Sequence, residues 1–212
     1  RLTPIGIFAL LTKLLAKQNL EIISQVGLFI AVVLLGTFIH GLVTLPLFLK
    51  AATGRSITEF FKSTYKALLL AFSTSSSSAT LPVSIECTEK NLKVDKNIAR
   101  FVLPIGSTIN MDGSALYEAI AAIFIANIAG ISLDISQQLT VFAMAIVGSI
   151  GAPGIPSAGM VTMIMVLQAV GLPAEGVVLL LPIDRLLDTF RTAVNVEGDI
   201  IGACIVDHNL KP

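Results

Sequence analysis

The sequence predicts an all-α membrane protein in which transmembrane helices are combined with two oppositely oriented re-entrant helical hairpins. Three observations lead to this prediction. Hydrophobic residues make up 54% of the 212 residues and charged residues only 13%, whereas soluble domains carry about 25% charged residues. One apolar run is long and unbroken, while the others are short or interrupted by polar or Gly/Pro-rich breaks. The basic residues gather on particular connections, which indicates the side of the bilayer on which each connection lies.

The overall charge and the cysteines exclude several classes of protein. The 14 basic and 14 acidic residues balance, and no basic run suggests a surface for nucleic acid. Cys87 and Cys204 are isolated thiols without metal-ligand spacing, so neither a disulfide framework nor a zinc site is indicated.

The first plain transmembrane run follows a shorter apolar stretch. Residues 4–15 are too short to span a bilayer, and the chain starts at Arg1 without the pattern of a signal peptide. We therefore expect the chain to be the C-terminal part of a longer protein. Residues 26–49 are apolar over a length that suits a spanning helix, which needs about 20 residues. They predict a helix over residues 22–50.

A first hairpin is predicted over residues 56–85. Its apolar arms, 60–72 and 81–85, flank the polar string STSSSSAT at 73–80 and are too short for two crossings. Basic residues lie on both flanks: Lys50, Arg55, Lys62 and Lys66 before the break, and Lys90, Lys93, Lys96 and Arg100 after it. The positive-inside rule places both flanks in the cytoplasm, so the segment enters and leaves on one side.

A second hairpin is predicted over residues 138–170, from the opposite face. The connections 130–138 and 171–176 contain Asp134 and Glu175 but no Lys or Arg, so both are expected outside. The apolar segment between them is broken by the Gly/Pro-rich stretch 148–156. Lys13 and Lys17 fall on the predicted outer side and oppose this topology, but eight basic residues favour it.

Two further helices complete the predicted fold. A helix over residues 98–129 is broken at 108–114, and a final helix over 174–208 carries several charges in an apolar frame. Interrupted hairpins of opposite orientation are typical of inverted-repeat transporters, which bind their ligand where the breaks meet. The fold class is therefore an inverted-repeat transporter core.

Acidic residues outnumber basic ones at membrane depth. The basic residues there are Arg185 and Arg191. The acidic residues are Asp112, Glu118, Asp184, Asp188, Glu197 and Asp199. An unpaired aspartate at the centre of a membrane helix is unfavourable by about 2.5 to 3.5 kcal/mol. Bound cations or protons are therefore expected.

The charges of the last helix form one polar stripe. With 3.6 residues per turn, one face holds Asp184, Asp188, Arg191, Asn195 and Asp199, while Glu197 falls on the opposite side. Within this stripe an aspartate suits an ammonium group, and an arginine one turn later suits a carboxylate. The stripe therefore fits a zwitterion with an additional carboxylate. A simple Asp188–Arg191 pair, or neutralisation of Asp188 by Arg185, are the alternatives.

The helix breaks offer further candidate ligands. Residues 75–78 supply serine hydroxyls and free backbone N–H groups for a carboxylate, or they form a low-complexity polar loop. Asn110 and Asp112 supply hard oxygens for Na⁺, or they mark a kink with a capping aspartate. Glu118 is either a protonatable carrier or a neutral buried acid. His40 is taken as a packing residue without a function.

Four ordered strings resemble one known family. They are SSSSATLP (75–82), PIGSTINMDGSALYE (104–118), SIGAPGIPSAG (149–159) and DRLLDTFRTAVNVEGD (184–199). They closely resemble the signature segments of the dicarboxylate/amino acid:cation symporters, the glutamate transporter family. The resemblance implies that residues 1–20 end a scaffold helix, the fifth transmembrane helix. Residues 21–212 would form the transport domain, with helix six, hairpin one, helix seven, hairpin two and helix eight.

The resemblance also implies a set of site residues. For the substrate these are Ser76, Ser77, Ser114, Ile155, Gly159, Asp188, Arg191, Thr192 and Asn195. One sodium site corresponds to Gly106, Asn110, Asn195 and Asp199, a second to Thr108, Ser149, Ile150 and Ala152, and part of a third to Asn110 and Asp112. Glu118 matches the acid of the proton- and potassium-coupled branch, where sodium-only relatives have glutamine.

Three positions depart from the family pattern. The arginine that the family usually carries beside the serines or after the substrate aspartate is replaced here by Ser75 and Thr189, and Arg185 is the candidate substitute. Pro153 in the second hairpin replaces what is often a small residue, which we expect to stiffen this lid.

The expected function is sodium-coupled symport of L-glutamate or L-aspartate, with elevator-like movement and with proton coupling as a further option. The protein is then no enzyme and needs no cofactor besides its coupling ions, Na⁺ and, as options, H⁺ and K⁺. We expect a multi-pass protein of the cell membrane, a homotrimer through scaffold helices. A neutral amino acid transporter for alanine, serine or threonine and an anion channel are the alternatives. An intramembrane serine hydrolase is disfavoured because no G-x-S-x-G elbow is present.

Overall fold

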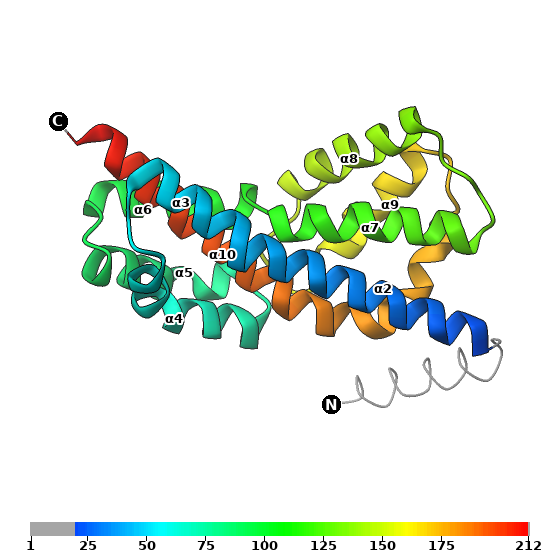
Figure 1. Cartoon of the computed structure of the whole chain (residues 1–212), viewed down its shortest axis with the longest axis horizontal. Coiled ribbons are helices and arrows are strands. Elements are labelled where there is room, and N and C mark those ends of the chain that lie inside the picture. The colour runs from blue at the N-terminus through cyan, green and yellow to red at the C-terminus, as the bar shows by residue number, and fades with distance from the viewer. Residues whose placement is uncertain (1–19, 212) are drawn as a thin grey trace.

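The computed structural model describes residues 20–211, with side chains from residue 24 onward, and within this part all regular secondary structure is helical. The molecule is elongated, and α10 (Leu181–Leu210) runs along most of its length (Figure 1). The predicted all-helical class is confirmed. The scaffold helix end predicted over residues 1–20 lies outside the described residues except for Leu20.

The first described element is a long apolar helix with one irregular turn. It consists of α2 (Leu20–Ile39), the π-helical turn η1 (His40–Thr44) and α3 (Leu45–Thr53). Pro46 has no N–H to continue the α-helical pattern, and Leu45 instead donates its N–H to the carbonyl of His40, five residues back. Ser24–Thr53 and Lys96–Ile128 are the two described segments long and apolar enough to cross a membrane.

The first broken segment consists of α4 (Ile57–Thr74), α5 (Ser77–Glu86) and the π-helical turn η2 (Cys87–Asn91). Ser75 ends α4 in the left-handed conformation, with φ of 51°, and Ser76 caps α5 by accepting a hydrogen bond from the N–H of Ala79. The break is therefore only two residues long, shorter than the predicted 73–80, because this cap lets the following serines enter the helix.

The next two segments are broken in the same way. Asn110 and Met111 separate α6 (Lys96–Ile109) from α7 (Asp112–Ile128). An irregular stretch with Pro153 and Pro156 separates α8 (Ile135–Ile150) from α9 (Gly159–Ala169). The 3-10 turn η3 (Ala174–Leu179) then leads to α10, which starts beside Pro182. Each predicted break is present, although each helix end differs from its prediction by a few residues.

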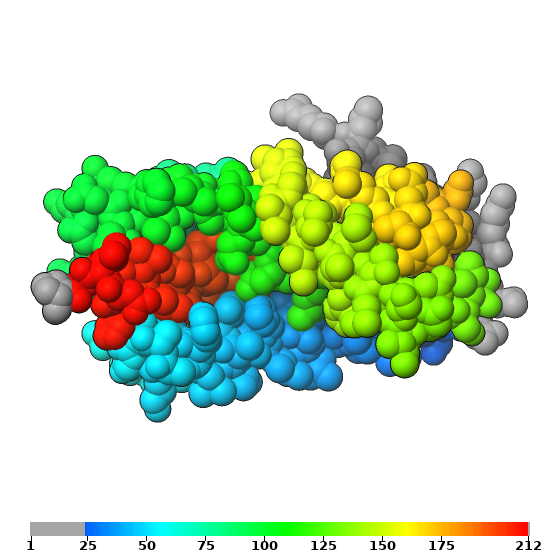
Figure 2. Space-filling view, turned by 90° about the horizontal axis from the view of Figure 1, so that it is seen from above, coloured from blue at the N-terminus to red at the C-terminus, as the bar shows by residue number. Residues whose placement is uncertain are grey.

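Two apolar cores lie along α10. One core contains Phe29, Tyr117, Met163 and Leu187, and joins α2, α7, α8, α9 and the first part of α10. The other contains Leu49, Phe60, Leu103 and Ile200, and joins α3, α4, α6 and the second part of α10. Figure 2 shows the green α6 half and the yellow α8–α9 half meeting at the middle of the molecule. The helix breaks and the polar stripe of α10 lie between these cores.

One end of the molecule is held together by polar contacts. Arg55, after α3, donates from Nη1 to the carbonyl of Leu92 at 2.9 Å. Asp207, near the end of α10, accepts from the N–H of Asp95 at 3.0 Å and lies 3.7 Å from Arg55. The two connections that flank the first broken segment and the C-terminal end of α10 therefore lie together, as the charge pattern predicts for one side of a membrane.

Candidate ligand and cation site

The break between α4 and α5 touches the break between α8 and α9. These two breaks are called the tips of their segments. Ser76 donates from Oγ to the carbonyl of Gly154 at 2.7 Å, and the N–H of Ser78 donates to the same oxygen at 3.2 Å. A Cβ atom at Gly154 would lie 2.5 Å from the carbonyl oxygen of Ser107 and 2.7 Å from Ser78 Oγ. Only glycine therefore allows this approach.

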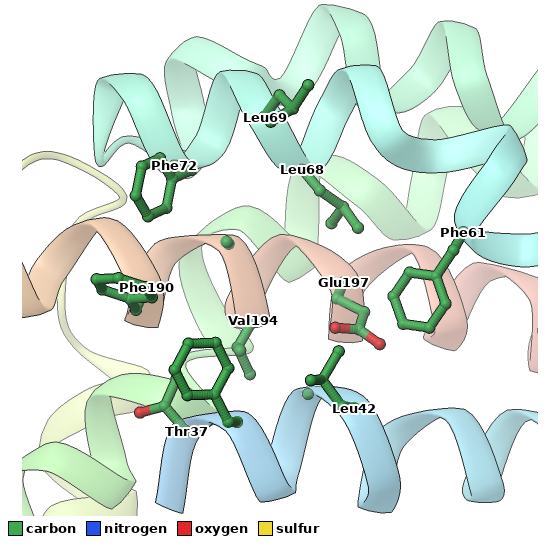
Figure 3. A pocket seen from close by; sticks show the side chains of 12 residues that line it. Thr37, Leu42, Phe61, Leu68, Leu69, Phe72, Phe190, Val194 and Glu197 are labelled. Carbon is green, nitrogen blue, oxygen red and sulfur yellow. The ribbon is translucent and has the colours of Figure 1, made fainter. Parts of the chain in front are cut away.

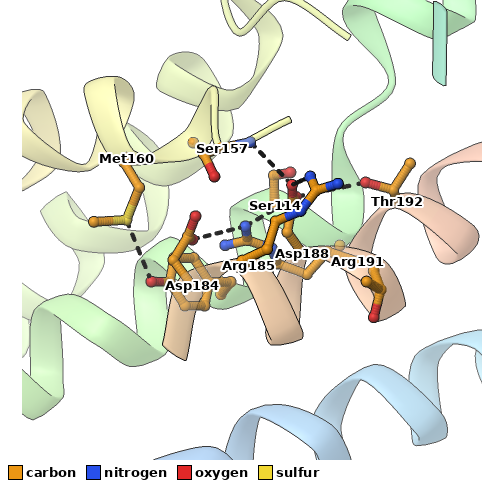
Figure 4. A network of polar contacts seen from close by, with 12 residues as sticks. Ser114, Ser157, Met160, Asp184, Arg185, Asp188, Arg191 and Thr192 are labelled. Carbon is orange, nitrogen blue, oxygen red and sulfur yellow. Dashed lines mark hydrogen bonds and ion pairs between the residues drawn. The ribbon is translucent and has the colours of Figure 1, made fainter. Parts of the chain in front are cut away.

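Arg191 is the most enclosed charge of the polar stripe. Its side chain is buried, and Nη2 donates to Asp184 Oδ1 and to Asp188 Oδ1, both at 2.9 Å (Figure 4). The guanidinium carbon lies 3.9 Å from the centre of the Tyr117 ring, which is cation–π geometry. Nε and Nη1 have no hydrogen-bond partner in the described chain. Two charged donors thus remain available behind the touching tips.

Asp188 is contacted both from its own helix and from the irregular stretch before α9. Its Oδ2 accepts a hydrogen bond at 2.9 Å from the N–H of Ser157, a residue of the irregular stretch before α9. The same oxygen lies 3.9 Å from Arg185 Nη1. Arg185 also donates to the carbonyl of Thr74 at 3.3 Å. Both pairings that the sequence left open, with Arg191 and with Arg185, are therefore present. An incoming ammonium group must displace Ser157 or Arg185 to reach this carboxylate.

A small cavity lies between the tips and α10. Seven of the predicted substrate residues line it, namely Ser77, Ser114, Ile155, Gly159, Asp188, Thr192 and Asn195. The other two predicted residues do not line the cavity. The hydroxyl of Ser76 donates to the Gly154 carbonyl, and the Arg191 side chain lies behind the cavity wall. Sequence reasoning missed Asp184, Tyr117 and Ser157 as contacts of the charged pair. Asp184 was visible one turn before Asp188, whereas the other two are brought close only by tertiary packing.

The first predicted sodium group is assembled around Asn110. Its Nδ2 donates to the carbonyl of Asn195 and to Asp199 Oδ1, both at 3.1 Å. A Cβ atom at Gly106 would lie 2.6 Å from Asp199 Oδ1, so this carboxylate rests directly on the α6 backbone. Carbonyl and carboxylate oxygens suit a hard cation. The amide of Asn110 presents N–H to these oxygens and would have to rotate to present its own oxygen to an ion.

The second predicted sodium group is only partly drawn together. Its members lie at the neighbouring ends of α6 and α8, which contact each other. The hydroxyls of Thr108 and Ser149 donate to Ile105 and Ile146 within their own helices, and the N–H of Ala152 donates to the carbonyl of Ser149. Ile150 is exposed. In the described chain no hydrogen bond links Thr108 to the other three.

Asp112 has a partner that the sequence analysis did not identify. Its Oδ2 lies 2.7 Å from His40 Nε2, and its Oδ1 accepts from the N–H of Gly113 at 3.0 Å. His40, to which the sequence assigns no role, therefore makes a polar contact with Asp112. The sequence signal for an irregular turn at His40 was Pro46, which follows the π-helical turn His40–Thr44. A Cβ atom at Gly198 would lie 2.6 Å from Asn110 Nδ2 and 3.3 Å from Asp112 Oδ2, so this pair adjoins Asn110.

Glu118 lies close to Arg191. Its side chain is buried, Oε1 accepts from the hydroxyl of Thr162, and Oε2 has no partner in the described chain. A Cβ atom at Gly159 would lie 3.5 Å from Glu118 Oε1 and 3.9 Å from Arg191 Nη1. A side chain at position 159 would therefore contact both groups, and the glycine leaves the space between Glu118 and Arg191 open.

Comparison with known proteins agrees with the motif reading. A family model described as the sodium:dicarboxylate symporter family matches residues 1–209. The chain is 49% identical over 211 residues to excitatory amino acid transporter 2 of Homo sapiens, which covers 99% of this chain and 37% of that protein. It is 51% identical over 205 residues to excitatory amino acid transporter 3 of Mus musculus, covering 96% and 39%. It is 47% identical over 207 residues to excitatory amino acid transporter 1 of Ambystoma tigrinum, covering 97% and 38%. The chain thus spans less than two fifths of these relatives.

Proposed function

The chain belongs to the sodium:dicarboxylate symporter family, and from this premise we propose that it forms the ligand-binding and sodium-binding part of a symporter for acidic amino acids. The family consists of transporters rather than enzymes. In this proposal the chain lies in the cell membrane and crosses it several times. The two broken segments α4–α5 and α8–α9 are re-entrant hairpins from opposite faces, and their touching tips close the ligand site. Residues 21–212 act as one transport domain.

One observation carries the choice of an acidic ligand. Arg191 is buried, yet its Nε and Nη1 donors have no partner in the described chain. Buried charged donors without partners are strongly unfavourable, and hydrogen bonds between a guanidinium and a carboxylate are charge-assisted and therefore strong. A ligand carboxylate that reaches Nη1 past Gly159 would give this donor a partner. Arg191 therefore supports a ligand with a side-chain carboxylate.

The remaining ligand groups follow from the cavity lining. The α-carboxylate would bind at the N-terminus of α5, with Ser76, Ser77 and Asn195, where the helix dipole favours an anion once Ser76 and Ser78 release the Gly154 carbonyl. The ammonium would bind Asp188 and Thr192 after release of the Ser157 N–H, so ligand entry and movement of the second tip are linked. Ser114, Ile155 and Gly159 complete the walls.

Sodium would couple to this site through shared residues. In the proposal Asn195 contributes to the ligand cavity and, with Gly106, Asn110 and Asp199, to one cation site. Thr108, Ser149, Ile150 and Ala152 form the second site once the tip of α8 moves, and Asp112 contributes to a third. An ion that turns the Asn110 amide also changes the carbonyl contact to Asn195. Sodium and ligand must then raise each other's affinity by the same factor.

We propose three further features. Glu118 is the carrier of a coupled proton or the potassium-dependent switch, supported by its burial and its position across Gly159 from Arg191. Movement of the domain is elevator-like, and the complete protein is a homotrimer assembled through helices that the family has and residues 20–211 do not include.

A neutral amino acid transporter is the second candidate. The observation that favours it is the double pairing of Arg191 with Asp184 and Asp188 at 2.9 Å. If both pairs persist when a ligand binds, the guanidinium is satisfied internally and no side-chain carboxylate is required. Alanine, serine or threonine would then be the ligand.

Calorimetric titration of the purified chain tests these candidates. L-aspartate, L-glutamate, L-serine and L-alanine are each added in NaCl and in choline chloride. Binding of the acidic amino acids only in NaCl is expected. If serine or alanine binds in a sodium-dependent way and neither aspartate nor glutamate binds, the neutral amino acid transporter replaces the acidic amino acid symporter as the proposed function. Absence of sodium-dependent binding for all four would overturn the proposal that this chain holds the ligand site.

A further inference from the structure

A second cavity lies on the other side of α10, away from the ligand cavity. It occupies about 260 Å³ between α2, η1, α4 and α10 (Figure 3). Its walls are apolar and include Phe38, Leu42, Phe72 and Phe190. Thr37 also lines it, but its hydroxyl donates to the carbonyl of Val33 at 2.8 Å. Apart from that hydroxyl, only one polar side chain among the described residues lines this cavity.

That side chain is Glu197, which projects from the face of α10 opposite the polar stripe. It is only 4% exposed, and Figure 3 shows its carboxylate directed from α10 toward Leu42. Oε1 has no hydrogen-bond partner in the described chain, and no basic side chain described there lies within ion-pair distance. A Cβ atom at Gly41 would lie 3.3 Å from Oε2, so the glycine leaves room beside the carboxylate.

The cavity favours an organic cation. A buried carboxylate without a partner is strongly unfavourable, and a bound positive charge relieves it. A metal ion such as Na⁺ or Ca²⁺ needs several oxygen ligands, and besides Glu197 the lining offers only the hydroxyl of Thr37, which is already bonded. Ammonium groups, by contrast, are satisfied by one carboxylate together with aromatic faces.

The aromatic walls are arranged for an elongated apolar body. Phe190 makes edge-to-face contacts with Phe38 and Phe72, with ring centres 5.6 Å and 5.0 Å apart. The three rings cross one end of the cavity, from α2 over α10 to α4, and Phe190 lies about two helical turns before Glu197 on α10. The volume of the cavity, about 260 Å³, is slightly below the range of about 300 to 1,000 Å³ for drug-sized ligand pockets. This favours a small ligand.

We propose that this cavity binds a lipophilic primary or secondary amine, with the ammonium on Glu197 and an aromatic or alkyl tail against Phe38, Phe72 and Phe190. The site is separate from the amino acid site, because Glu197 and the Asp188–Arg191 stripe lie on different faces of α10. Amino acids with a free α-carboxylate are excluded, since their negative charge would enter an apolar cavity that already holds Glu197.

Binding of phenylbutylamine to the purified chain in nanodiscs of zwitterionic lipid tests the proposal. Phenylbutanol is the neutral analogue of the same shape. We expect the amine to bind at least about tenfold more tightly than the alcohol, because a charge-assisted hydrogen bond to a carboxylate is stronger than a neutral one. Equal affinity for the amine and the alcohol would overturn the proposal without any variant.

Three variants locate the binding. Glu197→Gln should abolish the preference for the amine, while Glu175→Gln, the same change at an exposed residue of η3, should leave it intact. Ala193→Phe fills the cavity and should weaken both compounds. An unchanged amine preference in folded Glu197→Gln would overturn the proposal. Competition between the amine and L-aspartate in NaCl would also overturn it, because it would assign the amine to Asp188.

Discussion

Among single residues, Arg191 is the one on which the proposed choice of an acidic ligand depends. The planar guanidinium is packed against the Tyr117 ring and shares Nη2 between Asp184 and Asp188. Its other two donor atoms stay unpartnered in the described chain. The 3.6-residue period predicts that the two aspartates and the arginine share a face. It does not predict how many of the arginine donors the aspartates use, because this depends on rotamers fixed by the packing of Tyr117.

Replacing Arg191 tests this role. Both Arg191→Ala and Arg191→Lys should weaken L-aspartate binding at least about tenfold, since lysine keeps the charge but presents one compact ammonium without the fixed donor directions of the guanidinium. Calorimetry at saturating NaCl measures the loss. Arg100→Ala, which removes a surface arginine paired with Glu89, should have little effect. Retained aspartate affinity in Arg191→Ala would show that the acidic side chain is recognised elsewhere.

Gly106 is the corresponding test of the cation site. The Cβ of Gly106→Ala would lie 2.6 Å from Asp199 Oδ1, closer than side chains normally approach, so the carboxylate must shift away from Asn110. The NaCl concentration that gives half-maximal aspartate binding should rise severalfold, while affinity at saturating NaCl changes less. Gly27→Ala, with nothing within 4 Å of the added carbon, is the control. An unchanged sodium dependence would exclude Asp199 as a sodium ligand.

At the scale of elements, the sequence predicts where helices break but not how long each break is. Polar or Gly/Pro-rich strings mark all three breaks, because such residues are poor in helix interiors. The extent of the first break depends on whether Ser76 caps α5, and this cap is held in place by Gly154 of the other tip. The helix face on which His40 lies likewise depends on a π-helical turn. A regular helical period cannot predict such a turn.

The contact between the two tips can be disrupted at one position. Gly154→Ala places a carbon 2.5 Å from the carbonyl oxygen of Ser107 and should separate the tips, destabilising the closed form by about 1 to 3 kcal/mol. The melting temperature should fall, and sodium-dependent aspartate binding should weaken. Gly151→Ala in the same stretch meets only an ordinary contact of 3.6 Å and is the matched control. Equal effects of the two variants would mean that the tip contact does not contribute to the site.

The whole molecule places polar groups between two apolar cores. One core includes α7, α8 and α9, the other includes α4 and α6, and α10 passes through both. Because all three breaks lie between the cores, residues far apart in sequence, such as Ser76, Asn110 and Gly154, gather beside the middle of α10. The amino-acid pattern predicts this meeting of breaks, since inverted repeats bring interrupted helices to the same depth. The specific pairs within the polar layer depend on packing and were not predictable.

The orientation of the molecule in a membrane follows from its two ends and can be measured. Lys90 lies at the basic end, next to the connections joined by Arg55 and Asp207, whereas Glu175 lies on a connection without basic residues. Both are exposed, and the native thiols of Cys87 and Cys204 are buried, which keeps background labelling low. In intact cells a membrane-impermeant maleimide should therefore label Glu175→Cys but not Lys90→Cys, and inside-out vesicles should reverse the pattern. Labelling of both positions from the same side would contradict the opposite orientation of the two hairpins, because each hairpin returns to the face from which it enters.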